Sequence, residues 1–345
     1  MKARLIIYLI IYFIFSSINL VHYPNLFLRT IIFYAIGILI VIFMKRKYIK
    51  YVFYLYILFN VLLLYLLIFG NSVNGSRAWI NILGISFQPS EFMKIVLIIL
   101  LSIVVNRYEH YKLKCIILTL IPSILTFLEP DTGNVIFYLI ILISILFYKE
   151  ENKKRIFVIM FIICSLFVSF LCLIFINKGF LIDILGDSFI YRIDRITDLF
   201  DANTFQLKRS LINIGTSKLI GNSEYLYIPE ETTDFAFSYL IHNIGILGII
   251  AFLIFNLKFN FNLISIVKNS YGYFSCIAFS TLVLKFFQES IHELMGIGLF
   301  PITGITLPLV SYGGSSVLSF IIILSIIFNK DKDSNLDMDM GKVLD

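Results

Sequence analysis

Long apolar runs separated by short polar segments dominate the chain. A helix needs about 20 mainly apolar residues to cross the hydrocarbon core of a bilayer, and runs of about this length recur from one end of the sequence to the other. They predict an all-α polytopic membrane protein with ten transmembrane helices. The predicted spans lie near 4–21, 27–44, 48–70, 91–106, 114–128, 133–148, 156–177, 235–257, 271–289 and 303–328.

Composition excludes an ordinary soluble domain. Hydrophobic residues make up 59% of the chain and charged residues only 14%, whereas soluble domains have about 45–50% and about 25%. The four cysteines form no CxxC pair and lack a histidine at metal spacing, so they are interpreted as small apolar residues. The net charge of +6 does not indicate nucleic-acid binding, because the basic residues lie between apolar runs.

The basic residues instead predict orientation. They occupy alternate short loops, near 45–50, 107–114, 149–155 and 258–268. By the positive-inside rule these loops and both termini are cytoplasmic. The segments expected outside are then 71–90, 129–132, 178–234 and 290–302.

The spans form a single transmembrane domain over residues 1–328. Its one long polar insertion is the extracellular loop 178–234 between predicted helices seven and eight, and loops of this length are usually functional or disordered. Within the loop, the apolar spacing of 189–201 favours an amphipathic interfacial helix. The polar, mostly acidic tail 329–345 is expected to be a disordered cytoplasmic end.

The stretch 74–94 combines the only tryptophan, Trp79, with a polar helix start. Ser90 is predicted as the N-cap of the fourth helix and Glu91 as an acid in its first turn. Lys94 follows Glu91 at i+3, so the two side chains share a face. A charged residue inside a span favours function, although a snorkelling lysine with a structural partner is an equal alternative.

Two further polar motifs lie at predicted outer helix ends. In the turn EPDTG (129–133), Asp131 is an N-cap candidate. In 228–237, Asp234 precedes the eighth helix, where it fits either an N-cap or a general base. The sequence leaves both alternatives open.

The ninth span carries two polar stripes. Lys285 and Glu289 are spaced i, i+4, and Gln288 and His292 repeat that spacing. The following segment 300–316 contains two prolines and three glycines within an expected span. Broken helices are tolerated in membranes only where protein or a water-filled cavity satisfies the backbone, so this segment is expected to line a cavity.

These motifs resemble the SEDS family of bacterial cell-wall proteins, which includes RodA, FtsW and SpoVE. The resemblance rests, in the family's order, on GSRAW with FQPSEFMK, on EPDTG, on YRIDRI followed by Gln206, on PEETTDF and on FPITGITLPLVSYGGSS. It covers nearly the whole chain.

The resemblance implies a peptidoglycan glycosyltransferase that polymerises lipid II at the outer face of the bacterial cytoplasmic membrane. Asp234 matches the family's essential aspartate and would be the general base, while Lys94 with Arg192 or Arg195 would neutralise the departing pyrophosphate. A divalent cation, Mg or Mn, could share that task. A class B penicillin-binding protein is the expected partner. The residues expected to bind substrate are Arg77, Trp79, Glu91, Lys94, Arg192, Arg195, Lys285, Gln288 and His292.

The sequence also departs from the family pattern. Ala78 stands where the family has arginine, His242 and Asn243 replace an acidic pair, His292 replaces asparagine, and the glycine-rich turn near 215–221 is shortened. These departures hint at a divergent paralogue.

Two other functions are alternatives to the enzyme. A lipid II transporter would place charges near the bilayer midplane between repeats, whereas most ionisable residues here lie at outer helix ends and no repeat is visible. A non-catalytic scaffold for a transpeptidase fits the departures, but Asp234 and Trp79 are retained.

Overall fold

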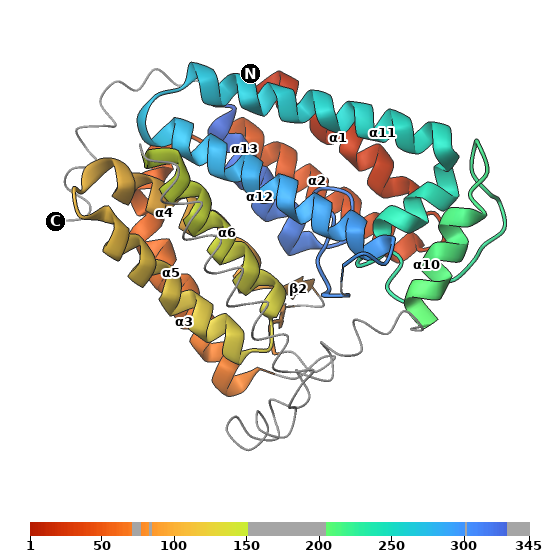
Figure 1. Cartoon of the computed structure of the whole chain (residues 1–345), viewed down its shortest axis with the longest axis horizontal. Coiled ribbons are helices and arrows are strands. Elements are labelled where there is room, and N and C mark those ends of the chain that lie inside the picture. Colours follow the sequence, from red (N-terminus) through yellow and green to blue (C-terminus); the bar gives the residue numbers. More distant parts are fainter. Residues whose placement is uncertain (71–76, 83–84, 151–204, 301, 330–345) are drawn as a thin grey trace.

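A computed structural model describes residues 1–70, 77–82, 85–150, 205–300 and 302–329. These residues form a helical bundle with one small hairpin (Figure 1). Seven of the described helices are long and apolar enough to cross a membrane. The helices are α1 (Lys2–Ile18), α2 (Pro24–Phe43), the 3-10 helix η1 (Arg46–Tyr51), α3 (Val52–Phe69), α4 (Pro89–Arg107), α5 (Tyr111–Leu128), α6 (Thr132–Lys149), α10 (Phe205–Gly215), α11 (Ala236–Asn269), α12 (Gly272–Gly296) and α13 (Gly314–Ile327).

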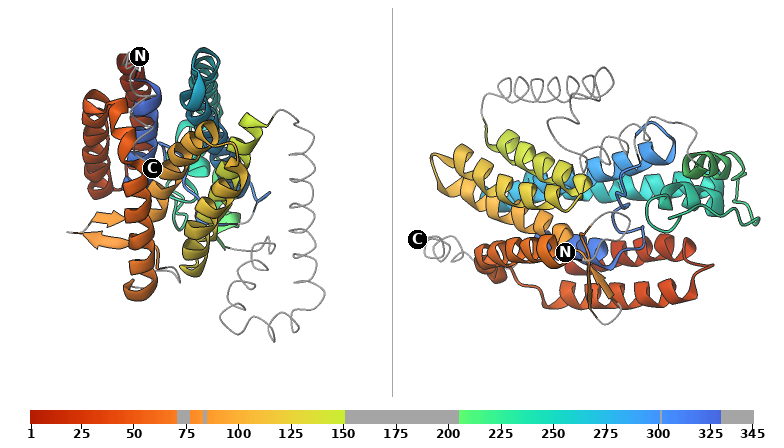
Figure 2. Two further views of the ribbon diagram at one scale, coloured as in Figure 1. Left: turned by 90° about the vertical axis from the view of Figure 1, so that its left-hand side faces the viewer. Right: turned by 90° about the horizontal axis from the view of Figure 1, so that it is seen from below.

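Helix α4 is the centre of the bundle. It contacts α3, α5, α6, α12 and α13, and nearly all of its residues are buried. By contrast, α2, α3 and α5 bury one stripe each and leave many apolar side chains exposed, as expected for helices that face lipid. Helix α12 lies between the α4–α6 group and α11 (Figures 1 and 2).

Nine predicted spans coincide with described helices, and the expected polytopic helical fold is confirmed. The predicted span 156–177, the amphipathic helix at 189–201 and the tail beyond residue 329 lie outside the described residues. The total of ten helices therefore stays a prediction.

The predicted span 303–328 is wrong in extent. Only Gly314–Ile327 is helical, whereas 302–313 is irregular. Pro308 cannot donate a helix hydrogen bond, and Gly304 and Leu309 have φ values of +72° and +62°, outside the right-handed helical region. Residues 302–313 therefore form an irregular connection, which we call the strap, in place of the first half of the predicted helix.

Helix α11 is longer than predicted and contains a kink. It runs to Asn269, and Gly245 has a φ of +70°. A Cβ at Gly245 would lie 2.2 Å from the backbone nitrogen of Gly221, so only glycine fits. The backbone N–H groups freed by the kink are used, because those of Ile246 and Leu247 donate to the carbonyls of Lys218 and Leu219, both at 3.1 Å.

Two further elements were not predicted. Helix α10 lies within the predicted loop 178–234 and packs Leu207, Ser210 and Asn213 inward. The antiparallel hairpin pairs β1 (Ile80–Ile82) with β2 (Ile85–Phe87) ahead of α4. Strands of three residues carry too weak a pattern to be identified from sequence.

The motif segments gather at one end of the bundle, which we call the motif end. The backbone N–H of Arg77 donates to the Glu129 carbonyl at 3.2 Å, and that of Tyr312 donates to the Thr232 carbonyl at 2.8 Å. The other end, which we call the basic end, carries Lys2 and the ion pair between Lys112 and Glu150. The motif end consists of 19–23, 77–82, 85–88, 129–131, 205–235, 297–300 and 302–313.

A buried ion pair within α12 is hydrogen-bonded to α11. Lys285 donates to Glu289 Oε1 at 2.5 Å, to Asn256 Oδ1 at 2.7 Å and to Asn260 Oδ1 at 3.0 Å. The Tyr12 hydroxyl of α1 donates to the same Asn256 oxygen at 2.6 Å. The charged groups are thus satisfied inside the protein, as a low-dielectric environment requires.

We expect Lys285→Met to destabilise the bundle by roughly 3–5 kcal/mol, because it leaves the Glu289 carboxylate buried without its cation. The double variant Lys285→Met with Glu289→Leu should recover most of this loss, since it removes both charges. Thermal unfolding in nanodiscs measures both effects. Equal melting temperatures for the single variant and the wild type would contradict the pairing.

Candidate functional site

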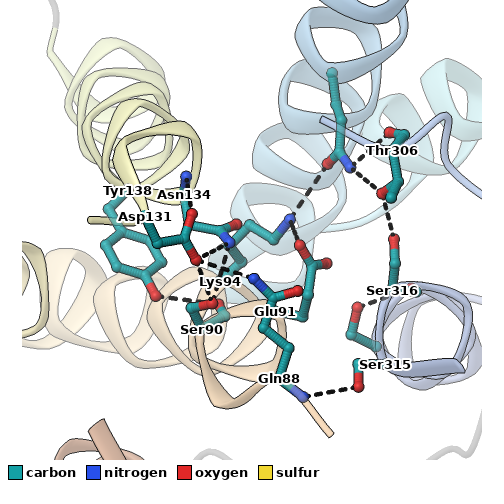
Figure 3. A network of polar contacts seen from close by, with 12 residues as sticks. Gln88, Ser90, Glu91, Lys94, Asp131, Asn134, Tyr138, Thr306, Ser315 and Ser316 are labelled. Carbon is teal, nitrogen blue, oxygen red and sulfur yellow. Dashed lines mark hydrogen bonds and ion pairs between the residues drawn. The ribbon is translucent and has the colours of Figure 1, made fainter. Parts of the chain in front are cut away.

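Asp131 organises the polar cluster between α4 and α6 (Figure 3). Its carboxylate accepts from Gln88 Nε2 at 2.9 Å, Ser90 Oγ at 2.9 Å and Asn134 Nδ2 at 2.8 Å. It also accepts from the backbone N–H of Asn134 at 3.3 Å, so Asp131 is the predicted N-cap of α6. A carboxylate with this many donors is held rigidly and joins two helices.

The predicted N-cap role of Ser90 is wrong. Helix α4 begins at Pro89 and its N-cap residue is Gln88, which provides no side-chain cap among the described residues. Proline suits this position because its missing N–H would be unpaired in a first turn. Ser90 instead donates to Asp131 and accepts from Asn134 Nδ2 at 3.0 Å.

Lys94 lies fully buried beside the Asp131 cluster (Figure 3). Its ammonium donates to Glu91 Oε1 at 2.9 Å and to Gln288 Oε1 at 3.5 Å. The ring of Phe137 lies 5.1 Å away, within cation–π range. The expected Glu91–Lys94 pair therefore forms, but as an internal pair rather than a snorkelling lysine.

A chain of hydrogen bonds continues from Gln288 to the strap. Gln288 Nε2 donates to the Thr306 carbonyl at 3.1 Å, and the Thr306 hydroxyl lies 3.0 Å from Ser316 Oγ. Ser315 Oγ accepts from the backbone N–H of Gln88 at 2.9 Å. Side chains of α12 and α13 thus link the strap to the start of α4.

Asp234 lies on a tight turn just before α11, at the motif end. Helix α11 has Phe235 at its N-cap, so Asp234 is not the cap that the sequence allowed. The Asp234 N–H donates to the Glu230 carbonyl at 3.0 Å. On the opposite side, a Cβ at Gly304 would lie 3.7 Å from Asp234 Oδ2, so the strap backbone lies against the carboxylate.

The environment of Asp234 favours its protonated form. Burial is the main cause and the nearby Glu230 carboxylate adds to it; together they raise the pKa of Asp234 to about 7. A carboxyl group with this pKa can accept a proton near neutral pH. Asp234 therefore has the chemistry of a general base.

The strap and α1 hold the Asp234 turn in place. Ser311 Oγ donates to the Thr233 carbonyl at 2.7 Å while it accepts from the Leu307 N–H at 2.8 Å. Asn19, at the end of α1, donates to the Ala236 carbonyl at 2.8 Å. The backbone is thus fixed on both sides of Asp234.

The turn is also fixed through Glu231, which sequence reasoning missed. Glu231 Oε1 accepts from the hydroxyls of Tyr23 at 2.7 Å and Tyr225 at 2.8 Å, and Oε2 accepts from the Ile228 N–H at 2.9 Å. Burial and this carboxylate raise the pKa of both tyrosines. No sequence spacing relates Tyr23 to Glu231, so this contact could not be found without the fold.

Glu129 is a second carboxyl group that sequence reasoning passed over, although it lies in the EPDTG motif. It is fully buried at the end of α5. Burial first, and the nearby charge of Asp131 second, raise the pKa of Glu129 to about 8.

The other predicted site residues are placed as follows. Trp79 is half-buried, and Arg77 is exposed with Nη1 3.3 Å from the Leu67 carbonyl. Lys285 lies on the α11 side of α12, where its internal partners account for its contacts. Arg192 and Arg195 lie outside the described residues.

All the family departures lie in described positions. Ala78 is buried, and the ring nitrogens of His242 lie 2.7 Å from the Glu224 carbonyl and 3.2 Å from the Asn213 carbonyl. His292 is fully buried between α11 and the strap.

The predicted divalent cation finds no ligand set in the described part of the chain. No group of three or more His, Cys, Asp or Glu side chains there could hold a metal ion. A divalent cation therefore stays a possibility that the described residues do not test.

Comparison with known proteins places this geometry in a family. The family profile described as cell cycle protein, FtsW/RodA/SpoVE, matches residues 3–336. A probable peptidoglycan glycosyltransferase FtsW of Wigglesworthia glossinidia brevipalpis is 33% identical over 93% of this chain and 84% of its own length. The peptidoglycan glycosyltransferase MrdB of Helicobacter pylori is 29% identical over 86% of this chain and 81% of its own length.

Solved structures show the same fold. A chain from a peptidoglycan synthase complex superposes with a TM-score of 0.76 at 22% identity, covering 94% of this chain and 95% of that one. The rod shape determining protein RodA of Thermus thermophilus superposes with a TM-score of 0.68 at 21% identity, covering 94% of each chain. Since the family profile spans nearly the whole sequence, the chain belongs to the FtsW/RodA/SpoVE family.

Proposed function

We propose that this chain is a peptidoglycan glycosyltransferase that polymerises lipid II, the undecaprenyl-pyrophosphate-linked disaccharide-peptide. The observation that carries the proposal is Asp234, a carboxyl group with a pKa of about 7 on a turn fixed from several sides. The names of the relatives support the same reaction class.

The proposed reaction is a single displacement. Asp234 takes the proton from the acceptor sugar hydroxyl, whose oxygen forms the new bond to the donor anomeric carbon. The bond from that carbon to the pyrophosphate oxygen breaks, and the configuration at the carbon inverts. The lipid-linked pyrophosphate leaves with the electron pair of the broken bond.

Lys94 contributes a positive charge beneath the site in this proposal. Because it is buried between Glu91 and Gln288, it acts on the departing pyrophosphate through its field rather than by direct contact. Arg192 and Arg195 remain proposed partners of the pyrophosphate, and Arg77 and Trp79 remain proposed substrate contacts from the hairpin side of the motif end.

We further propose a multi-pass protein of the bacterial cytoplasmic membrane, with both termini cytoplasmic and the motif end outside. The positive charges of the basic end support this orientation. A class B penicillin-binding protein is the proposed partner, since one solved structure of the same fold belongs to a peptidoglycan synthase complex.

A transporter finds less support in the geometry. The buried Lys285–Glu289 pair is satisfied by protein groups, whereas transport needs a charged site that is open to a ligand. A polymerisation assay of the purified wild-type protein distinguishes the scaffold alternative from the enzyme.

Asp234→Asn should abolish polymer formation from lipid II while the melting temperature stays near that of the wild type, because the amide keeps the shape but cannot accept the proton. The assay uses purified full-length protein, with and without its transpeptidase partner, and gel-resolved glycan strands. Wild-type yield from the variant would remove the base assignment. A wild-type protein without activity in both settings would favour a scaffold.

The rate of polymerisation should fall as the pH falls through about 7, because protonated Asp234 cannot act as a base. Glu230→Gln should shift this acid limb to lower pH, because it removes a negative charge that raises the pKa of Asp234. Initial rates between pH 5 and 9 test both points. An acid limb that does not move in Glu230→Gln would contradict the electrostatic part of this assignment.

Lys94→Met should lower both activity and stability, because Glu91 then loses the cation that binds its Oε1. The matched double variant Lys94→Met with Glu91→Gln removes both charges. We expect it to regain stability but not activity, as measured by melting temperature and polymer yield. Recovery of activity together with stability would show that the pair is only structural.

A membrane-impermeant maleimide should label Ser223→Cys in intact cells, in a background without the four native cysteines. Ser223 is exposed at the motif end, and Glu109 is exposed between α4 and α5 at the basic end. Glu109→Cys should therefore react only after permeabilisation. The reverse pattern would overturn the proposed orientation.

A further inference from the structure

Two side chains of α12 form hydrogen bonds with consecutive residues of the strap. Gln288 and His292 are spaced i, i+4 and therefore share one face of the helix. Gln288 Nε2 lies 3.1 Å from the Thr306 carbonyl, and His292 Nδ1 lies 2.7 Å from the Ile305 carbonyl. Both side chains are buried, so their polar atoms depend on these partners.

The second polar atom of each side chain reaches in a different direction. Gln288 Oε1 accepts from the Lys94 ammonium of α4 at 3.5 Å. His292 Nε2 accepts from the backbone N–H of Phe237 at 3.2 Å. That N–H belongs to the first turn of α11, where helical N–H groups lack an intrahelical partner.

The hydrogen bonds of His292 define its protonation. Because Nε2 accepts from a backbone N–H, it carries no proton, and the proton is on Nδ1, which donates to Ile305. Only this neutral tautomer satisfies both partners. Neither ring nitrogen is left to bind a substrate.

These contacts hold segments that lie next to Asp234. Phe237 is three residues after it, and Ile305 is next to Gly304, whose backbone lies against the Asp234 carboxylate. His292 therefore ties together the two segments that enclose Asp234. Gln288, one turn away, ties the same strap to Lys94.

We propose that Gln288 and His292 are positioning residues that fix Asp234 and Lys94 relative to each other through the strap, and not the substrate contacts that the sequence suggested. The proposal rests on the proposed function of Asp234 and Lys94. It gives the asparagine-to-histidine departure at position 292 a role, because the imidazole reaches two backbone segments at once.

The test compares His292→Phe, which keeps the ring but no polar atom, with His292→Gln, whose amide oxygen can reach the Phe237 N–H. Misplacing a reacting group by about 1 Å can cost about 100-fold in rate. We therefore expect kcat on lipid II to fall about tenfold or more in His292→Phe, with a smaller change in KM. His292→Gln should recover part of the loss.

A second readout separates positioning from general destabilisation. If His292→Phe lets water reach Asp234, the acid limb of the pH–rate profile should shift to lower pH, because burial is the main cause of the raised pKa. The matched control is Ser210→Ala in α10. It removes a 2.6 Å hydrogen bond to the Gly296 carbonyl of α12, the helix that carries His292. It should lower the melting temperature without moving the acid limb.

The outcomes are distinct. An unchanged kcat and acid limb in His292→Phe would overturn the proposal, as would losses no larger than those of Ser210→Ala. If His292→Phe does not fold, Gln288→Met tests the other arm, and an unchanged kcat there overturns the proposal. Activity of Asp234→Asn in the same assay would instead contradict the proposed function on which it rests.

Discussion

The backbone N–H and C=O groups of the strap 302–313 lack helical partners, and the need to pair them constrains the helices around it. A non-helical segment packed within a membrane protein must have its N–H and C=O groups paired by protein or water. Here the partners are side chains: His292 for the Ile305 carbonyl, Gln288 for the Thr306 carbonyl and Tyr34 for the Leu309 carbonyl. Two helices, α2 and α12, therefore bring polar groups into an otherwise apolar interior to pair with the strap.

The same constraint generates the site. Once side chains satisfy the strap, its own groups can hold the Asp234 turn, as Ser311 does through the Thr233 carbonyl. The strap backbone at Gly304 thereby lies against the Asp234 carboxyl group, and burial, with the nearby Glu230, raises its pKa to about 7. Lys94 is tied to the same strap through Gln288. Asp234, the proposed base, and the buried Lys94 are thus both tied to the strap by hydrogen bonds.

Much of the fold could be predicted from sequence, because apolar runs long enough to span a bilayer are a strong signal. The Glu91–Lys94 pair and the Asp131 cap were also predictable, since both depend on local spacing. The predictions that failed concern contacts between residues far apart in the sequence. Ser90 is not a cap because α4 already begins at Pro89, and its hydroxyl donates to Asp131, 41 residues later. Helix α11 kinks where the loop around Gly221 fits against it. Helix α10 was missed because two of its three buried residues, Ser210 and Asn213, are polar.

In the proposed mechanism, Asp234 takes the proton of the acceptor hydroxyl, and the positive charge of Lys94 favours departure of the pyrophosphate. The most direct measurement is a cryo-EM structure of Asp234→Asn bound to lipid II in nanodiscs. The account predicts a sugar hydroxyl within about 3 Å of the residue 234 side chain, with the pyrophosphate at the motif end above Lys94. Lipid II bound with both its sugars and its pyrophosphate away from residue 234, or at the basic end, would contradict it.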